Sequence, residues 1–150
     1  MAELAQDVVM KFAPIAHQQE VNLNADYPQS LPSVNADIGM IERVMSNLIK
    51  NAIQYTPAGG DVKVAIQQNN GHVAISVADT GTGIPPEEIP LVTERFYRVE
   101  KSRSRDSGGG GLGLAIATKL LDLHESSLTI ESEVGIGTEM RFSLDAASVN

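Results

Sequence analysis

The apolar residues of the chain recur with helical spacing most clearly after Asp37. From there to Ala52 they fall three or four positions apart and form one continuous face, which predicts an amphipathic helix. Asp37 is suited to cap the amino end of this helix, and a turn rich in proline and glycine at 56–60 should end it. The apolar positions of the face are Ile38, Ile41, Val44, Met45, Leu48, Ile49 and Ala52.

Similar spacing predicts two further helices and a short helical turn. The first dozen residues form an amphipathic helix that Pro14 should kink or end. Residues 112–123 form another helix, and Pro85-Pro86-Glu87 is typical of the start of a short one. The segment 95–111 has few apolar residues and ends in four glycines, which predicts a loop.

Alternating apolar and polar residues predict five short strands. They cover residues 21–25, 62–66, 73–77, 128–131 and 138–144. The second and third strands are separated by Asn69-Asn70-Gly71, and the last two by a turn containing Gly135 and Gly137, so each pair should form a hairpin. This order of elements predicts an α+β fold with a largely antiparallel sheet and helices packed on one face.

Composition narrows the class of protein. With 150 residues, 42% of them apolar, the chain can form one domain with a substantial core, and the absence of cysteine excludes disulfides and thiolate metal sites. No apolar run approaches the roughly 18 residues of a membrane span, so a soluble, cytoplasmic protein is expected. A net charge of −8 argues against nucleic acid as a partner.

Basic residues gather in one short stretch of this acidic chain. Five of the eleven lie between positions 95 and 105, where a solvated loop is the ordinary interpretation and a contact with an anionic ligand is the alternative. They are Arg95, Arg98, Lys101, Arg103 and Arg105.

Three polar or aromatic residues follow one another along the long helix. Asn47, Asn51 and Tyr55 are four positions apart and therefore lie on the same side. The two asparagines are either ordinary residues at the edge of the core or part of a site, in which their amide oxygens could hold Mg²⁺ and its waters. Tyr55 could then form an aromatic wall.

Asp79 directly follows an apolar strand and precedes Gly81 and Gly83. An aspartate at the start of a glycine turn is common, so its role can be structural. Alternatively, its carboxylate could accept a hydrogen bond from the exocyclic amine of adenine. Guanine has a carbonyl at that position and would leave the carboxylate unpaired, at a cost of about 1–3 kcal/mol or more.

The sequence SGGGGLGL, residues 107–114, leads into a predicted helix. Gly108, Gly110 and Gly113 match the dinucleotide fingerprint literally, but the buried strand that this fingerprint requires is missing before it, so a Rossmann site is disfavoured. Glycines at the amino end of a helix expose free N–H groups and suit a polyphosphate.

The order of these motifs is more specific than any one of them. NLIKNAIQY, DTGTGIP, ERFYR, GGGGLGL and GIGTEMRF together resemble the N, G1, F and G2 boxes and the closing glycine turn of sensor histidine kinases, members of the GHKL ATP-binding superfamily. The resemblance implies a two-layer α/β sandwich whose mixed, mostly antiparallel sheet is covered on one face by three main helices. It implies an ATP-binding catalytic domain at 19–150, with 1–18 a helical stub from a missing dimerisation domain.

The resemblance also implies roles for individual residues. Asn47 would contact phosphate, Asn51 would ligate the Mg²⁺ bound to ATP, Tyr55 would pack by the adenine and Asp79 would bind its amino group. Further nucleotide contacts are implied for Gly81, Gly83, Ile84, Phe96, Arg98, Lys101, Gly109, Gly110, Gly111, Leu112, Gly113, Leu114 and Thr138.

Some positions depart from the family pattern. Gln54 stands where Lys or Arg is frequent, Gly110 replaces a usual Thr or Ser, and residues 124–127 replace a common His-Gly-Gly turn. These departures remove possible phosphate contacts and leave the geometry of that turn open, but none of them touches Asp79 or Asn51.

The resemblance leaves three activities to distinguish. The hydrolase branch of the superfamily has a glutamate four residues before its Mg²⁺-binding asparagine; here that position is Asn47, whose neutral amide cannot take a proton from water. The expected activity is therefore transfer of the γ-phosphoryl group of ATP to a histidine, with a non-catalytic nucleotide-binding module as the alternative. None of His17, His72 and His124 lies in a phosphoacceptor motif, so no catalytic residue is assigned and self-phosphorylation is not expected.

The expected partners follow from this activity. The acceptor histidine would lie on the dimerisation domain of the parent kinase, and a response regulator would be an indirect partner. The isolated chain is expected to be monomeric, and its parent could be an inner-membrane sensor.

Overall fold

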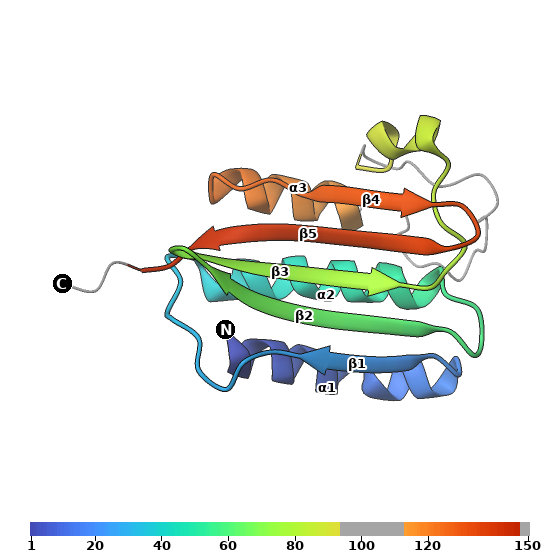
Figure 1. Ribbon diagram of the computed structural model, residues 1–150, viewed down its shortest axis with the longest axis horizontal. Helices are drawn as coiled ribbons and strands as arrows, with labels where there is room; N and C mark the ends of the chain where they lie inside the picture. Colours follow the sequence, from blue (N-terminus) through green and yellow to red (C-terminus); the bar gives the residue numbers. More distant parts are fainter. Residues whose placement is uncertain (94–112, 148–150) are drawn as a thin grey trace.

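The computed structural model describes residues 1–93 and 113–147, and Figure 1 shows how their elements follow one another. Five strands form one sheet in the order β1-β2-β3-β5-β4, in which only β1 and β2 pair in parallel. The elements are α1 (Ala2–Gln18), β1 (Asn22–Asp26), α2 (Ile38–Gln54), β2 (Asp61–Asn69), β3 (His72–Asp79), η1 (Pro86–Leu91), α3 (Gly113–Leu123), β4 (Thr129–Glu133) and β5 (Gly137–Asp145).

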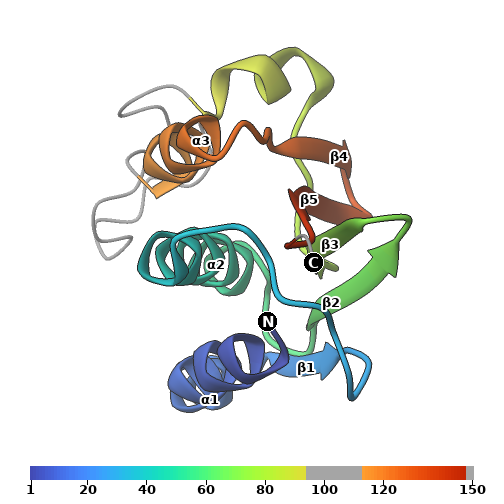
Figure 2. The same ribbon diagram turned by 90° about the vertical axis from the view of Figure 1, so that its left-hand side faces the viewer.

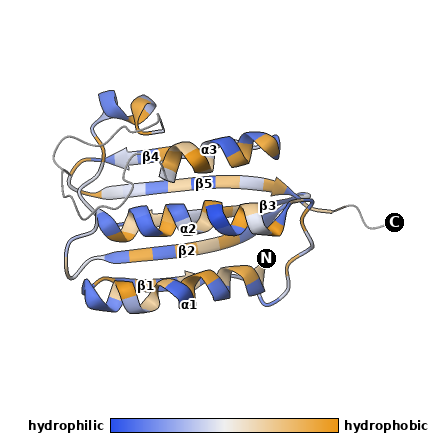
Figure 3. Cartoon of the chain, turned by 180° about the vertical axis from the view of Figure 1, so that it is seen from behind, coloured by the Kyte–Doolittle hydropathy of each residue, from blue (hydrophilic) through white to orange (hydrophobic). Residues whose placement is uncertain are grey.

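The three α-helices lie side by side on one face of the sheet (Figure 2). The predicted α+β sandwich, with a mixed and mostly antiparallel sheet, is therefore confirmed. The helices turn their apolar sides toward the sheet, and Figure 3 shows polar residues along their outward sides. Among the described residues, none of the helices combines the length and hydropathy that a bilayer crossing requires.

The central helix α2 forms as its pattern predicts. The Asp37 side chain caps it by accepting a hydrogen bond from the Met40 amide at 3.0 Å, which satisfies one of the free N–H groups of the first turn. At the other end the Thr56 hydroxyl donates to the Ala52 carbonyl at 2.7 Å. The apolar side of α2 is buried almost completely, from Ile41 to Ile53, and forms the centre of the core.

The first helix does not end at Pro14, as one of the two predicted outcomes had it, because α1 continues to Gln18. Proline removes one backbone donor, but the buried series on either side of it continues with Phe12 and Ala16. Packing of this side against α2 and β1 outweighs the local penalty. Helix α1 thus shares one hydrophobic core with the other described elements. Its origin as part of a dimerisation domain stays a prediction.

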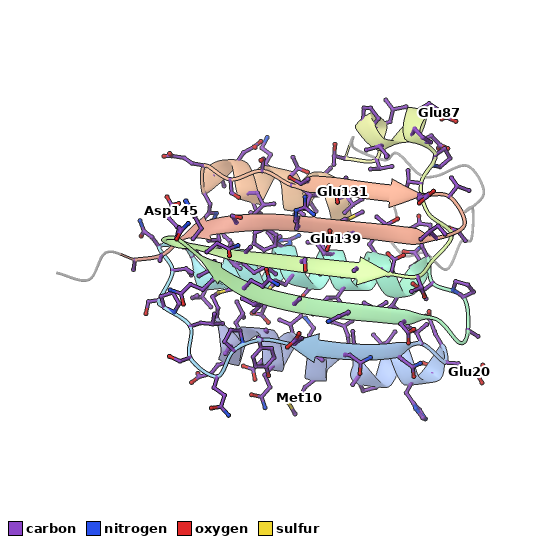
Figure 4. All side chains as sticks on the ribbon, viewed as in Figure 1. Met10, Glu20, Glu87, Glu131, Glu139 and Asp145 are labelled. Atoms are coloured by element: carbon purple, nitrogen blue, oxygen red, sulfur yellow. The ribbon has the colours of Figure 1, made fainter. Side chains whose placement is uncertain are left out.

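Both predicted hairpins are confirmed, with strand ends shifted by one to three residues. The β2–β3 turn places Asn70 and Gly71 at positive φ, 38° and 85°, as expected of an Asn-Gly hairpin. The sheet face away from the helices is polar. There Arg141 pairs with Glu131 and Glu139 at 3.1 Å and 2.7 Å, on the side that faces the viewer in Figure 4.

Candidate functional site

Asp79 is the last residue of β3 and belongs to the series that points toward the helices. Val73, Ile75 and Val77 alternate along this strand and are buried in the core, so the next inward position carries a carboxylate instead of an apolar group. The strand register places Asp79 opposite Thr138 of β5, and Thr138 opposite Ser132 of β4. These three residues, called the Asp79 row below, lie side by side across three adjacent strands.

Burial makes the charge of Asp79 unfavourable. It raises the pKa of this carboxyl above its ordinary value, although hydrogen bonds from the backbone amides of Gly81 and Thr138 oppose the shift. The Gly81 amide donates to Oδ1 of Asp79 at 2.8 Å. A ligand that donates further hydrogen bonds to this carboxylate would replace the hydration lost on burial.

Two glycines let the backbone after Asp79 fit between α2 and the β4–β5 turn. A Cβ atom on Gly81 would come within 2.4 Å of the Tyr55 carbonyl oxygen, and the Thr82 amide donates to that same oxygen at 3.3 Å. Gly83 has φ +77°, and a Cβ there would lie 2.3 Å from the Glu133 carbonyl oxygen. Residues 80–84, the base loop below, are therefore packed on both sides.

Ser132 is a functional candidate that the sequence reasoning missed. Its hydroxyl accepts a hydrogen bond from the Ile84 amide at 2.7 Å, donates to the Gly137 carbonyl at 3.0 Å and lies 2.7 Å from the Thr138 hydroxyl. Thr138 itself is buried. The strand predicted from the sequence ended at residue 131, whereas β4 continues to Glu133 and places Ser132 on the same side as the partly buried Ile130.

The predicted phosphate side of the site lies between α2 and the start of α3. Asn47 donates from Nδ2 to the Gly113 carbonyl at 3.0 Å, so this asparagine connects the two helices. Asn51 is half-buried one turn further along α2, and Tyr55 lies at its end beside the base loop. Leu114 is buried in the core.

The structure thus brings together the predicted residues of two groups. One surrounds the base loop, and the other lies between α2 and α3; Asn47 and Tyr55 are about 12 Å apart along the helix axis. The first group contains Tyr55, Asp79, Gly81, Gly83, Ile84 and Thr138, and the second contains Asn47, Asn51, Gly113 and Leu114. The remaining predicted residues lie outside the described part of the chain: Phe96, Arg98, Lys101, Gly109, Gly110, Gly111 and Leu112.

A shallow depression of about 550 Å³ lies elsewhere, between the end of α1 and the turn before β2. It is lined in part by Glu20, Asn22 and Gly59, which are used in local structure: the Glu20 carbonyl accepts from the Gly59 amide at 2.8 Å, and Asn22 Nδ2 donates to Asp61 at 3.0 Å. The Asp79 row combines burial, charge and close backbone packing, so it is the stronger candidate.

Comparison with known proteins shows the family of the chain. A family described as "Histidine kinase-, DNA gyrase B-, and HSP90-like ATPase" matches residues 36–148, a range that contains α2, the base loop and the last hairpin. The chain belongs to this ATPase family.

The relatives of this ATPase domain include sensor histidine kinases. RppB of Synechocystis sp. is 40% identical over 147 residues, which are 98% of this chain and 32% of RppB. WalK of Bacillus subtilis is 40% identical over 129 residues, 85% of this chain and 21% of WalK. The chain spans about a third of the length of the curated relatives RppB and SenX3 that it matches.

Solved structures agree on the fold. Full-length ShkA, crystallised in complex with AMPPNP, gives a TM-score of 0.83 at 29% identity, covering 98% of this chain and 30% of ShkA. The mycobacterial sensor histidine kinase MprB gives 0.79 at 27% identity and covers 97% of each chain. The ATPase domain described here is homologous to the catalytic domains of histidine kinases.

Proposed function

We propose that this ATPase domain binds ATP with Mg²⁺ and transfers the γ-phosphoryl group to a histidine on a separate dimerisation domain, as part of two-component signal transduction. The observation that carries this proposal is the half-buried carboxylate of Asp79, placed on the core side of the sheet beside a glycine loop. Family membership and the AMPPNP complex of ShkA support a nucleotide as the ligand.

The base would bind at the Asp79 row. The carboxylate accepts hydrogen bonds and its charge is disfavoured by burial, so a donor such as the amino group of adenine satisfies it, whereas the carbonyl of guanine does not. Tyr55 at the end of α2 and Ile84 in the base loop would offer apolar contacts to the flat ring.

The phosphates and Mg²⁺ would bind between α2 and α3. The amide oxygen of Asn51 is a hard neutral ligand of the kind that Mg²⁺ accepts beside phosphate oxygens and waters. When bound there, Mg²⁺ would supply positive charge that stabilises the transferred phosphoryl group. Asn47 holds the first turn of α3, whose free N–H groups suit phosphate oxygens.

Efficient hydrolysis is the less favoured activity. At the position of a catalytic glutamate the chain has Asn47, and its Nδ2 donates to Gly113, so this amide serves as a donor and cannot act as a base toward water. A non-catalytic nucleotide-binding module would bind ATP equally well but fail to phosphorylate any acceptor.

The partners belong to the same proposal. The relatives are about three times as long as this chain, so the acceptor histidine would lie in the remainder of a parent kinase, with a response regulator acting after it. We expect the isolated domain to be a cytoplasmic monomer, and the parent could be a membrane sensor.

Two measurements test the proposed function. Calorimetric titration with Mg·ATP and Mg·GTP should give binding of ATP alone or a clear preference for it. The domain, mixed with [γ-³²P]ATP and a separately produced histidine-bearing dimerisation domain, should then label that domain at histidine. ATP binding without labelled acceptor would favour the non-catalytic module, and label on the ATPase domain alone would contradict transfer to a separate domain.

A further inference from the structure

Ser132 lies at the centre of a small hydrogen-bond network behind the base loop. Three partners surround its hydroxyl oxygen within 3.0 Å: the Ile84 amide, the Gly137 carbonyl and the Thr138 hydroxyl. Ile84 belongs to the base loop, and Gly137 and Thr138 are the first two residues of β5, so the network joins the parts of the protein that surround Asp79.

The chemistry of these groups fixes the direction of each hydrogen bond. A serine hydroxyl has one proton and two lone pairs. The Ile84 N–H can only donate, so it uses one lone pair, and the Gly137 carbonyl can only accept, so it requires the Ser132 proton. The contact with Thr138, at 2.7 Å, is then satisfied only if Thr138 donates its own proton to the second lone pair of Ser132.

This arrangement has a consequence for Thr138. Its single proton is committed to Ser132, so its oxygen keeps two lone pairs and acts toward any further group as an acceptor. Thr138 is the direct cross-strand neighbour of Asp79, and its backbone amide donates to the Asp79 carboxylate. Two acceptors, a carboxylate and a hydroxyl oxygen, therefore lie side by side at this end of the sheet.

We infer that Ser132 is a positioning residue for nucleotide specificity: it holds the Thr138 hydroxyl as an acceptor and fixes the base loop through the Ile84 amide. An exocyclic amine has two N–H donors that match two neighbouring acceptors, whereas the carbonyl of guanine has none. The inference rests on the proposed binding of ATP and extends it to a residue that does not touch the base.

Removing the Ser132 hydroxyl would release the Thr138 proton. In Ser132→Ala the Thr138 hydroxyl can turn and donate to an acceptor such as a guanine carbonyl, and the Ile84 amide loses its partner. We expect the ratio of GTP to ATP dissociation constants to fall about fivefold or more. Ser132→Thr keeps the hydroxyl and should hold the ratio within about twofold of the unchanged protein.

Ser126→Ala is the matched control. Ser126 lies in the segment between α3 and β4, and its hydroxyl donates to the Ser143 carbonyl of β5 at 2.6 Å, at the opposite end of the sheet. The Ser126→Ala variant should lower the denaturation midpoint as Ser132→Ala does. It should leave the ratio of GTP to ATP dissociation constants unchanged. A loss of stability alone would leave the ratio of GTP to ATP dissociation constants unchanged in both variants.

The experiment is calorimetric titration of the full 150-residue chain and the three variants with Mg·ATP and Mg·GTP, alongside urea denaturation. If Ser132→Ala fails to fold, Thr138→Val replaces the acceptor oxygen by a methyl group and should reduce the ratio by a similar factor. An unchanged ratio in the folded variant that is tested would overturn the role of Ser132. Absence of ATP binding by the unchanged chain would instead reject the proposed function itself.

Discussion

The two ends of the sheet are built from the same kinds of polar group but use them differently. At one end, where β3 finishes, the Asp79 row and the base loop come together (Figure 1). At the other end, the His124 ring accepts from the Asp37 amide at 3.0 Å, its Nδ1 lies 2.8 Å from the Leu120 carbonyl, and Ser126 donates to a strand carbonyl. Both ends connect helices or turns to strands.

The difference lies in charge and burial. At the His124 end the bonded groups are neutral or exposed to water, so each hydrogen bond has only a modest net effect on stability. At the Asp79 end a carboxylate is held where its ionised form is unfavourable, near two glycines at which an added Cβ atom would clash with neighbouring backbone. An arrangement that costs stability is typical of a ligand site. The hydrogen bonds at the His124 end, in contrast, connect helix and strand and stabilise the fold.

The largest effect is expected from Gly83→Ala compared with Gly71→Ala. Both glycines have positive φ, +77° and +85°, so both alanine variants pay the left-handed backbone strain of about 1–2 kcal/mol. Only at Gly83 would the new Cβ meet the Glu133 carbonyl, which should cost about 1–3 kcal/mol more. Urea denaturation measures the difference, and equal losses would mean that the base loop is not confined by the β4–β5 turn.

Asp79→Asn should lower ATP affinity roughly tenfold to a hundredfold, since a hydrogen bond to a charged group is worth about 1.5–3 kcal/mol and the amide can turn a donor toward the base. Calorimetric titration with Mg·ATP checks this. Affinity equal to that of the unchanged domain would reject the assignment of the base site.

The same substitution should not destabilise the free domain at neutral pH. Because burial raises the pKa of Asp79 above 3.8, the folded state binds this proton more tightly than the unfolded state. The contribution of Asp79 therefore makes stability fall as pH rises from the ordinary value through the raised one. Asp79→Asn should remove this slope, which denaturation curves recorded between pH 4 and 8 would measure.

His124→Ala should have a smaller effect and act on stability alone. It removes the acceptor of the Asp37 amide, at a cost of about 0.5–1.5 kcal/mol. The affinity for Mg·ATP should stay within about twofold, because the hydrogen bonds of His124 are to Asp37 and Leu120, outside the Asp79 row and the base loop. A loss of affinity comparable to that in Asp79→Asn would remove the distinction between the two ends.

The smallest effect is expected on the uncovered face of the sheet. Arg141 pairs with Glu131 and Glu139 there, but these side chains are exposed to solvent, so Arg141→Ala should leave the denaturation midpoint nearly unchanged. The measurable effect of this substitution should be a change in the pKa of Glu131. Hydrogen bonding to Arg141 lowers the pKa of Glu131, which should return toward 4.5 in the variant, as an NMR titration can follow.

The sequence predicts most of the fold because its local signals agree with tertiary packing. Helix α2, both hairpins and the inward position of Asp79 follow from periodicity and turn residues alone. The end of α1 does not, because packing of Ala16 outweighs the local effect of Pro14. The roles assigned to Asn51 and Tyr55 toward a nucleotide remain predictions.

Other features depend on register and helix packing, which periodicity does not contain. Ser132 becomes a candidate only once β4 and β5 are paired and it is seen to lie opposite Thr138. Likewise, the hydrogen bond from Asn47 to Gly113 requires the packing of α2 against α3, because the two residues are 66 positions apart in the sequence.

The Asp79 row joins residues from β3, β4 and β5, and β5 lies between the other two strands. Ligand binding therefore depends on the last hairpin: a chain shortened before Thr138 would retain Asp79, the base loop and the residues of β4, yet lack β5, through which β4 joins β3. A compound that binds only when all three strands are in place would also stabilise the folded domain and raise its melting temperature. At concentrations well above the dissociation constant, this stabilisation grows with the logarithm of the compound's concentration.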